Sequence, residues 1–137
     1  MKRLLIFIFF TLTLFIGFMG CAVPIYKSTE LTPGKLDFET EYDSVHVESR
    51  INGNVQHMRK FYFKDSKIVC ETYYVTLAAA AYAKVRYSDE KYYYPDGKLK
   101  YEEITKRNNI MIETDYDESG KVTKRDKKYV IRDKWKF

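Results

Sequence analysis

Polar and apolar residues alternate along much of this chain with a period of two, which is the feature that most limits how it can fold. The alternation is clearest over residues 36–43, 110–116 and 129–137. Residues 45–47 continue the first stretch out of phase, which predicts a bulge or bend near residues 43–44. A period of two is typical of strands with one buried and one solvated face. Thirteen tyrosines and nine phenylalanines fit this pattern, because aromatic side chains pack well on sheets, and together they predict an all-β fold.

Three turn segments share a pattern in which a tyrosine is followed by a short polar loop, a lysine and an aliphatic residue. Three-residue loops that close on a glycine in the left-handed conformation would place the tyrosine opposite the aliphatic residue each time. The third loop position is glycine in two segments but Ser66 in the first, so that copy must be strained or use another turn. The pattern indicates a degenerate hairpin repeat. The expected pairs are Tyr62 with Ile68, Tyr93 with Leu99, and Tyr116 with Val122.

Two further segments connect the expected strands. Asn52-Gly53 is the signal of a two-residue hairpin loop, which would set Glu48 opposite His57. Residues 77–83 are rich in alanine, which favours helix, but the stretch is too short for a helix without packing support. It is either one helical turn over the sheet or a strand whose small side chains admit a close neighbour.

The hairpin segments 92–100 and 116–122 combine an aromatic strand, a turn of the Pro-Asp-Gly-Lys kind and an aliphatic strand. This unit resembles the bacterial MORN-variant repeat, which implies a series of antiparallel hairpins. Some relatives of that family are labelled antitoxins, and many are exported proteins of unknown role. We expect an antiparallel meander of about six to eight strands over residues 35–137, in a curved sheet or a partly closed barrel.

The first residues have the features of an export signal. Lys2 and Arg3 precede an apolar run over residues 4–19, which is shorter than the roughly 20 residues that cross a bilayer as a helix. Gly20 then stands directly before Cys21. We expect residues 1–20 to be a helical signal peptide. An ordinary secretory cleavage and an uncleaved anchor are the alternatives.

Residues 18–21, Phe-Met-Gly-Cys, resemble the lipobox of bacterial lipoproteins. The resemblance implies that the Cys21 thiol carries a diacylglycerol, with fatty acids such as palmitate, and that Cys21 becomes the first residue after cleavage. Residues 21–34 show no clear period and would form a lipidated tether. We expect the protein in the bacterial cell membrane, held by its lipid anchor. Ala22, in place of an aspartate, indicates the periplasmic face of the outer membrane if the host has one.

The charge of the chain limits its partners. The formal net charge is +5, and Lys2 and Arg3 contribute two of these charges, so the domain itself is only mildly basic. We therefore expect no binding of nucleic acid. Residues 35–49 are mainly acidic and residues 121–137 mainly basic. This division predicts ion pairs between strands from the two ends, or a basic end that faces anionic lipid headgroups.

The sequence contains no catalytic constellation, phosphate-binding glycine loop or zinc motif. His46 and His57 are expected on paired strands as surface side chains, because a metal site needs more converging ligands. Apart from the candidate lipid site, Cys70 is the only cysteine, and we expect it to be buried as a small apolar residue. We expect no enzyme activity, no cofactor and no metal.

Tyrosine supplies the candidate binding surface of the sequence. Side chains of successive strand residues point to opposite faces, so at least one of the tyrosines at 92–94 faces outward. An outward stripe of tyrosines rimmed by lysine would suit contact with a protein or a glycan. Half-buried phenol groups beside a one-sided core are the alternative. The residues of this candidate stripe are Tyr62, Tyr93, Tyr94, Tyr101 and Tyr116.

These features predict a non-enzymatic, membrane-anchored cell-envelope lipoprotein that presents a β-sheet binding surface to a protein or an envelope polymer. A second hypothesis is an inhibitor or immunity-type, antitoxin-like protein that blocks a toxin or hydrolase at the membrane. A third is an enzyme. A protruding acidic loop would favour the inhibitor, whereas a deep pocket with converging acids or histidines would favour the enzyme.

Overall fold

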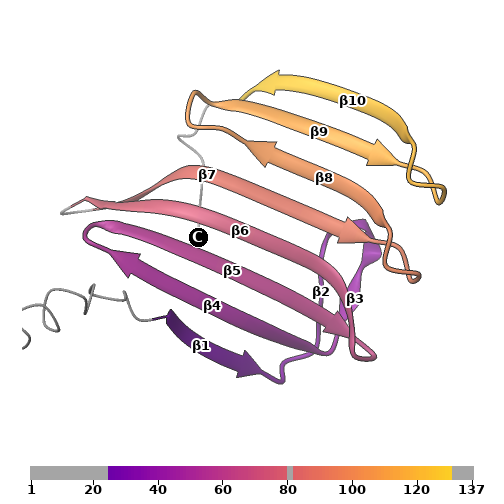
Figure 1. Cartoon of the computed structure of the whole chain (residues 1–137), viewed down its shortest axis with the longest axis horizontal. Coiled ribbons are helices and arrows are strands. Elements are labelled where there is room, and N and C mark those ends of the chain that lie inside the picture. Colours follow the sequence, from indigo (N-terminus) through magenta and orange to yellow (C-terminus); the bar gives the residue numbers. More distant parts are fainter. Residues whose placement is uncertain (1–24, 80–81, 131–137) are drawn as a thin grey trace, which may run out of the picture.

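Eight strands form one antiparallel sheet in the order β1-β4-β5-β6-β7-β8-β9-β10 (Figure 1). A computed structural model of the chain describes residues 25–79 and 82–130. From β4 onward each strand pairs with the next, which confirms the predicted all-β antiparallel meander. β1 and β10 are the edges of this sheet, so the sheet is open and does not close into a barrel. The strands are β1 (Ile25–Glu30), β2 (Gly34–Lys35), β3 (Glu41–Tyr42), β4 (Ser44–Asn52), β5 (Val55–Lys64), β6 (Lys67–Ala79), β7 (Tyr82–Tyr93), β8 (Leu99–Thr105), β9 (Ile110–Tyr116) and β10 (Val122–Tyr129).

The sheet begins earlier in the chain than we expected, because residues 25–30 of the predicted tether form the edge strand β1. Ile25 lies opposite Arg50 of β4, and Glu30 lies opposite Val45. All six side chains of β1 are exposed. Backbone hydrogen bonds can hold an edge strand without burial of its side chains, so the sequence shows no alternation here.

Several predictions concern residues outside the described ranges. They are the signal peptide of residues 1–20, Cys21 with the start of the tether, and the chain beyond Val130. The alternation predicted over residues 129–137 is therefore described only at its first residues, where Tyr129 ends β10.

Residues 36–43 do not form the predicted strand. Instead β2 and β3 pair as a short hairpin around a 3₁₀ turn (Asp37–Glu39). Phe38 and the residue after it have positive φ values of 55° and 57°, and the chain reverses there. The reversal places the Phe38 ring centroid 5.0 Å from that of Tyr92 and 4.6 Å from that of Tyr101. The alternation over residues 36–43 therefore reflects the packing of an aromatic ring from this segment against rings of the sheet, and not a strand with one buried face.

The second and third copies of the hairpin repeat are confirmed. Tyr93 lies opposite Leu99, and Tyr116 lies opposite Val122. Both three-residue loops end in a glycine, with φ values of 86° and 88°. A loop with the same hydrogen bonds joins β8 to β9 and ends in Asn109, with a φ of 62°. The sequence reasoning missed this loop because asparagine is a weaker signal of the left-handed conformation than glycine.

The first copy uses a shorter turn, and the predicted pair of Tyr62 with Ile68 is wrong. Asp65 and Ser66 form a two-residue loop with φ values of 48° and 64°, the signs required by a type I′ turn. The Asp43 carboxylate accepts a hydrogen bond of 3.0 Å from the Asp65 backbone N–H. This support comes from a residue distant in sequence, so local turn chemistry could not reveal it.

The β4–β5 hairpin is shifted by two residues from the predicted register. Residues 53–54 form its loop, and Glu48 lies opposite Arg59 instead of His57. Gly53 takes the first loop position with a φ of 58°, where a type II′ turn prefers glycine. A shift of two residues keeps every side chain on its expected face, because the side-chain period of a strand is two.

The alanine-rich stretch is strand where it is described, because β6 ends at Ala79 and β7 begins at Tyr82. Within the described residues no ion pair joins the acidic segment 35–49 to the basic residues 121–130, because five strands separate β4 from β10; the basic residues beyond Val130 lie outside the described ranges. Lys128 of β10 instead pairs with Glu113 of the neighbouring β9 at 2.5 Å.

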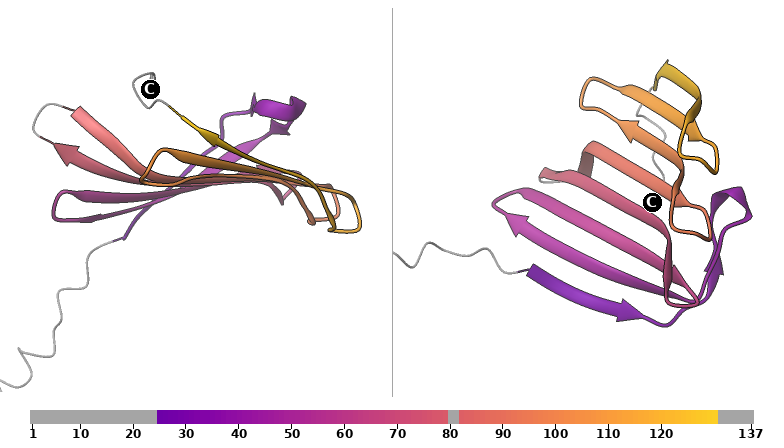
Figure 2. Two further views of the ribbon diagram at one scale, coloured as in Figure 1. Left: turned by 90° about the horizontal axis from the view of Figure 1, so that it is seen from above. Right: turned by 45° about the vertical axis from the view of Figure 1, so that its right-hand side comes forward.

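The β2–β3 hairpin stands on one side of the sheet, which we call the hairpin face, and the other side is the open face (Figure 2). Register and the alternation of side chains assign each strand residue to one of them. Most buried side chains lie on the hairpin face, where Cys70 has no exposed surface, as predicted. The buried residues of this face are Val45, Cys70, Thr72, Val85, Ser88, Tyr92 and Thr105.

Candidate functional site

The five tyrosines of the predicted stripe do not share one surface. Tyr62 and Tyr101 lie on the hairpin face, each in ring contact with an aromatic residue of the β2–β3 segment. The register places Tyr93 and Tyr116 on the open face. Tyr94 follows β7, and its hydroxyl donates a hydrogen bond of 2.8 Å to the backbone carbonyl of Tyr116. All five side chains are half-buried.

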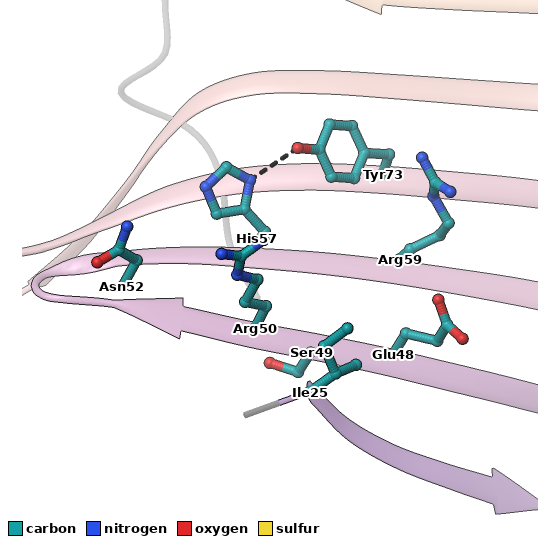
Figure 3. A pocket seen from close by; sticks show the side chains of 8 residues that line it. All are labelled: Ile25, Glu48, Ser49, Arg50, Asn52, His57, Arg59 and Tyr73. Atoms are coloured by element: carbon teal, nitrogen blue, oxygen red, sulfur yellow. Dashed lines mark hydrogen bonds between the residues drawn. The ribbon is translucent and has the colours of Figure 1, made fainter. Parts of the chain in front are cut away.

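Aromatic and basic side chains gather on the open face of β5 and β6, and we call His57, Arg59, Phe61 and Tyr73 the open-face cluster. His57 Nδ1 and the Tyr73 hydroxyl are hydrogen-bonded at 2.7 Å (Figure 3). The Arg59 guanidinium carbon lies 5.3 Å from the Tyr73 ring centroid and 5.9 Å from that of Phe61. Arg59 Nε also lies 3.4 Å from a Glu71 carboxylate oxygen. Cation–π contacts of this kind hold the guanidinium in a defined place on the surface.

The open-face cluster borders a groove of about 420 Å³ at the end of the sheet where β1 begins (Figure 3). Hydrogen-bond donors dominate its described lining, and Glu48 is the only carboxylate there. A hydrogen bond from Lys27, at 2.8 Å, lowers the pKa of Glu48, so this acid is already partnered. The groove suits polar or anionic groups of a partner. Its lining comprises Ile25, Glu48, Ser49, Arg50, Asn52, His57, Arg59 and Tyr73.

A second hollow, of about 270 Å³, lies on the hairpin face beside the 3₁₀ turn, and we call it the hairpin-face pocket. Phe38 forms one wall, since its ring packs on two tyrosines of the sheet. The described lining combines three carboxylates, four aromatic rings, three of them tyrosines, and one serine. It consists of Asp37, Phe38, Tyr74, Ser88, Glu90, Tyr92, Tyr101 and Glu103.

Two acids of the hairpin-face pocket, Glu90 on β7 and Glu103 on β8, lie directly opposite each other. The Tyr92 hydroxyl donates to Glu90 at 2.5 Å, and the Tyr101 hydroxyl donates to Glu103 at 3.2 Å. Burial, and then the charge of Glu90, raise the pKa of the Glu103 carboxyl. Facing carboxylates in different surroundings can serve as an acid–base pair or as a site for a cation.

The sequence reasoning did not single out Glu90 or Glu103. Simple extension of the predicted Tyr93–Leu99 pairing sets Glu90 opposite Glu102 and leaves Glu103 on the other face. A bulge between Tyr92 and Tyr93 shifts the register by one residue, and Glu103 becomes the partner. Because a one-residue shift exchanges the faces, only the tertiary structure brings these two acids together.

Within residues 25–79 and 82–130, no three side chains of His, Cys, Asp or Glu converge as metal ligands. The same residues include no helix with the length and apolar character to cross a bilayer. Comparison of the chain with models of known families, with curated proteins and with solved structures finds no match. The resemblances to lipoproteins and to MORN-variant repeats therefore stay predictions from the sequence.

Proposed function

We propose that this chain is a lipid-anchored protein of the bacterial cell envelope, without enzyme activity, that presents the open face of its sheet to a partner protein. The open-face cluster is the observation that carries this proposal. It combines the exposed arginine Arg59 with half-buried tyrosine and phenylalanine side chains that hold it in place. Tyrosine and arginine are the residue types enriched at the energetic centres of protein interfaces.

The position of β1 adds support for a role close to the membrane. Ile25, the first residue of the sheet, lies only four positions after Cys21 in the sequence. Four residues span at most about 14 Å when fully extended. A lipid on Cys21 would therefore hold the groove beside the open-face cluster close to the membrane surface, since Ile25 lines that groove.

The β2–β3 segment favours a second candidate function, the inhibitor of a toxin or hydrolase. The 3₁₀ turn (Asp37–Glu39) stands out from the sheet, as Figure 2 shows, and carries two acids, followed by Glu41. A protruding acidic loop is the feature that an inhibitor would insert into a basic active-site cleft. In this case the partner would contact the hairpin face and not the open face.

Metabolic labelling tests the anchor. Cells that express the full chain and grow with labelled palmitate are expected to incorporate the label into the protein and to retain it in the membrane fraction. The Cys21→Ser variant is expected to lose both the label and the membrane association. Cys70→Ser is the matched control, because the Cys70 thiol is buried and burial raises its pKa. Equal labelling of Cys21→Ser, or removal of Cys21 during normal processing, would refute the proposal.

Capture from detergent-solubilised envelope tests the binding surface. The wild-type chain is expected to retain one stoichiometric protein, and Arg59→Ala to weaken its binding about tenfold or more, as loss of a central interface arginine does. Tyr129→Ala is the control, because Tyr129 is exposed on the same face at the opposite edge of the sheet. Binding that survives Arg59→Ala but depends on Asp37 would instead support the inhibitor.

A further inference from the structure

We propose that the hairpin-face pocket binds an organic ammonium group, as carried by a small amine or by a lysine side chain of a partner. The pocket lies on the opposite side of the sheet from the open-face cluster. Its chemistry involves neither lipidation nor the open face, so the inference goes beyond the function proposed above.

The charge of the pocket is the first observation. Asp37, Glu90 and Glu103 line it, and no lysine, arginine or histidine is present in its described lining. Among the ion pairs of the described chain, none involves Glu90 or Glu103. Like charges directly opposite on neighbouring strands are destabilising. A bound cation would relieve that repulsion.

Glu90, Glu103 and Glu113 form one row across β7, β8 and β9. Glu113 shows how the chain neutralises a carboxylate of this row with a side chain of its own. Glu113 lies opposite Glu103 on β9 but outside the pocket, and Lys128 neutralises it at 2.5 Å. The chain thus supplies its own counterion to the acid that lies outside the pocket. Inside the pocket Glu90 and Glu103 each receive a hydrogen bond from a tyrosine hydroxyl, and the charge of Lys128 acts on Glu103 from outside the pocket.

Aromatic rings form the remaining walls. Phe38, Tyr74, Tyr92 and Tyr101 line the pocket together with the acids. The negative faces of aromatic rings attract ammonium groups, and the attraction grows when the site is shielded from water. The chain itself illustrates this attraction, because the Lys100 ammonium lies 5.7 Å from the Phe38 ring centroid. Lys100 is not part of the described pocket lining.

An ammonium group fits these features better than a metal ion or an anion. It offers three donors to carboxylate and hydroxyl acceptors and also interacts with aromatic rings. The described acids do not converge in the manner of metal ligands. A volume of about 270 Å³ accommodates an amine with a short carbon chain but is small for a drug-sized molecule.

Titration calorimetry on the full-length chain in detergent at pH 7.5 tests the proposal with two probes. The first is 1,4-diaminobutane, and the second is an acetylated and amidated tripeptide with lysine between two glycines. At least one probe is expected to bind, and the probe that binds more tightly identifies the ammonium as that of a small amine or of a side chain.

Two isosteric variants locate the binding. Glu90→Gln is expected to weaken binding about tenfold or more, because it removes a charged acceptor but keeps the volume and can still accept from Tyr92. Glu113→Gln is the matched control from the same row and is expected to change affinity by less than about threefold, since Glu113 lies outside the pocket and its charge is paired with Lys128. Circular dichroism melting of each variant verifies that it is folded.

Three results would overturn the inference. One is the absence of binding heat for both probes at millimolar concentration. Another is an equal loss of affinity in Glu90→Gln and Glu113→Gln. The third is displacement of the bound amine by micromolar calcium, which would identify a metal site. None of these results bears on palmitate labelling, so failure here is distinguishable from failure of the proposed function.

Discussion

Single residues with positive φ determine how the tight turns of this sheet are built. Gly97 and Gly120 end three-residue loops, and a Cβ atom at either position would meet nothing within 4 Å. Glycine is therefore favoured at these positions by the left-handed backbone conformation and not by a lack of space for a side chain. Ser66 adopts the same region with a φ of 64° but carries a side chain, so it pays a conformational cost that glycine avoids.

Ser66→Gly is accordingly expected to raise the free energy of unfolding by about 1 kcal/mol, because a type I′ turn favours glycine at its second position. Gly120→Ala is expected to lower it by about the same amount, since its φ of 88° is unfavourable for alanine. Urea unfolding monitored by circular dichroism measures both changes. If Ser66→Gly destabilised the protein, the side chain of Ser66 rather than its backbone would be important for the turn.

At the scale of elements, the β2–β3 hairpin is held on the sheet by aromatic contacts. Phe38 packs on two sheet tyrosines, and Tyr42 packs edge-on against Tyr62 with ring centroids 5.0 Å apart. Gly34 permits the close pairing of the hairpin, because a Cβ atom there would lie 2.4 Å from the Tyr42 hydroxyl oxygen. The hairpin is therefore held on the sheet by a few ring contacts, whereas Gly34 allows the Tyr42 ring to lie close within the hairpin itself.

Phe38→Ala is expected to lower the free energy of unfolding by about 1–2 kcal/mol, the typical value of aromatic pairs with modest burial. Amide hydrogen exchange in β2 and β3 is expected to accelerate, while exchange in β9 and β10 stays unchanged. Ile51→Ala, at an exposed position of β4, is the control for loss of apolar surface without loss of the hairpin contacts. Unchanged exchange in β2 and β3 would show that the hairpin is held by other contacts.

At the scale of the whole molecule, the two faces of the sheet have different electrostatic properties. The groove on the open face is rich in arginine and histidine, whereas the pocket on the hairpin face is lined by acids. Because burial raises the pKa of Glu103, the folded chain binds the proton of the Glu103 carboxyl more tightly than the unfolded chain does. The contribution of Glu103 to stability is therefore lost as pH rises from its ordinary value of 4.5 through the raised value.

Glu103→Gln is expected to raise the melting temperature at pH 7, because the variant no longer has to keep a charge in the pocket. Below pH 4.5 the gain is expected to shrink, since the wild-type carboxyl is then protonated in both states. Melting curves between pH 4 and pH 8 check the sign. A variant that is less stable than wild type at pH 7 but equally stable at pH 4 would show that the Glu103 charge stabilises the fold.

Much of the strand pattern could be predicted from local features of the sequence. The turn glycines and the alternation around residues 110–116 are local, and they correctly indicated an antiparallel meander, including the pairs Tyr93–Leu99 and Tyr116–Val122. The edge strand β1 was missed because its exposed side chains carry no pattern. The stretch over residues 36–43 was misread because its alternation arises from contacts with distant tyrosines.

The sequence by itself determined that this chain forms hairpins of paired strands, because side-chain period and turn chemistry act over only a few neighbouring residues. Only the tertiary structure decided which side chains share a face. A bulge of one residue moves the side chains that follow it to the other face of the sheet, and no local feature of the sequence indicated where these bulges lie. The bulge beside Tyr92 placed Glu90 opposite Glu103, and the reversal at Phe38 laid a ring beside them. Both candidate sites combine residues from several strands, so they come into existence only when those strands pair.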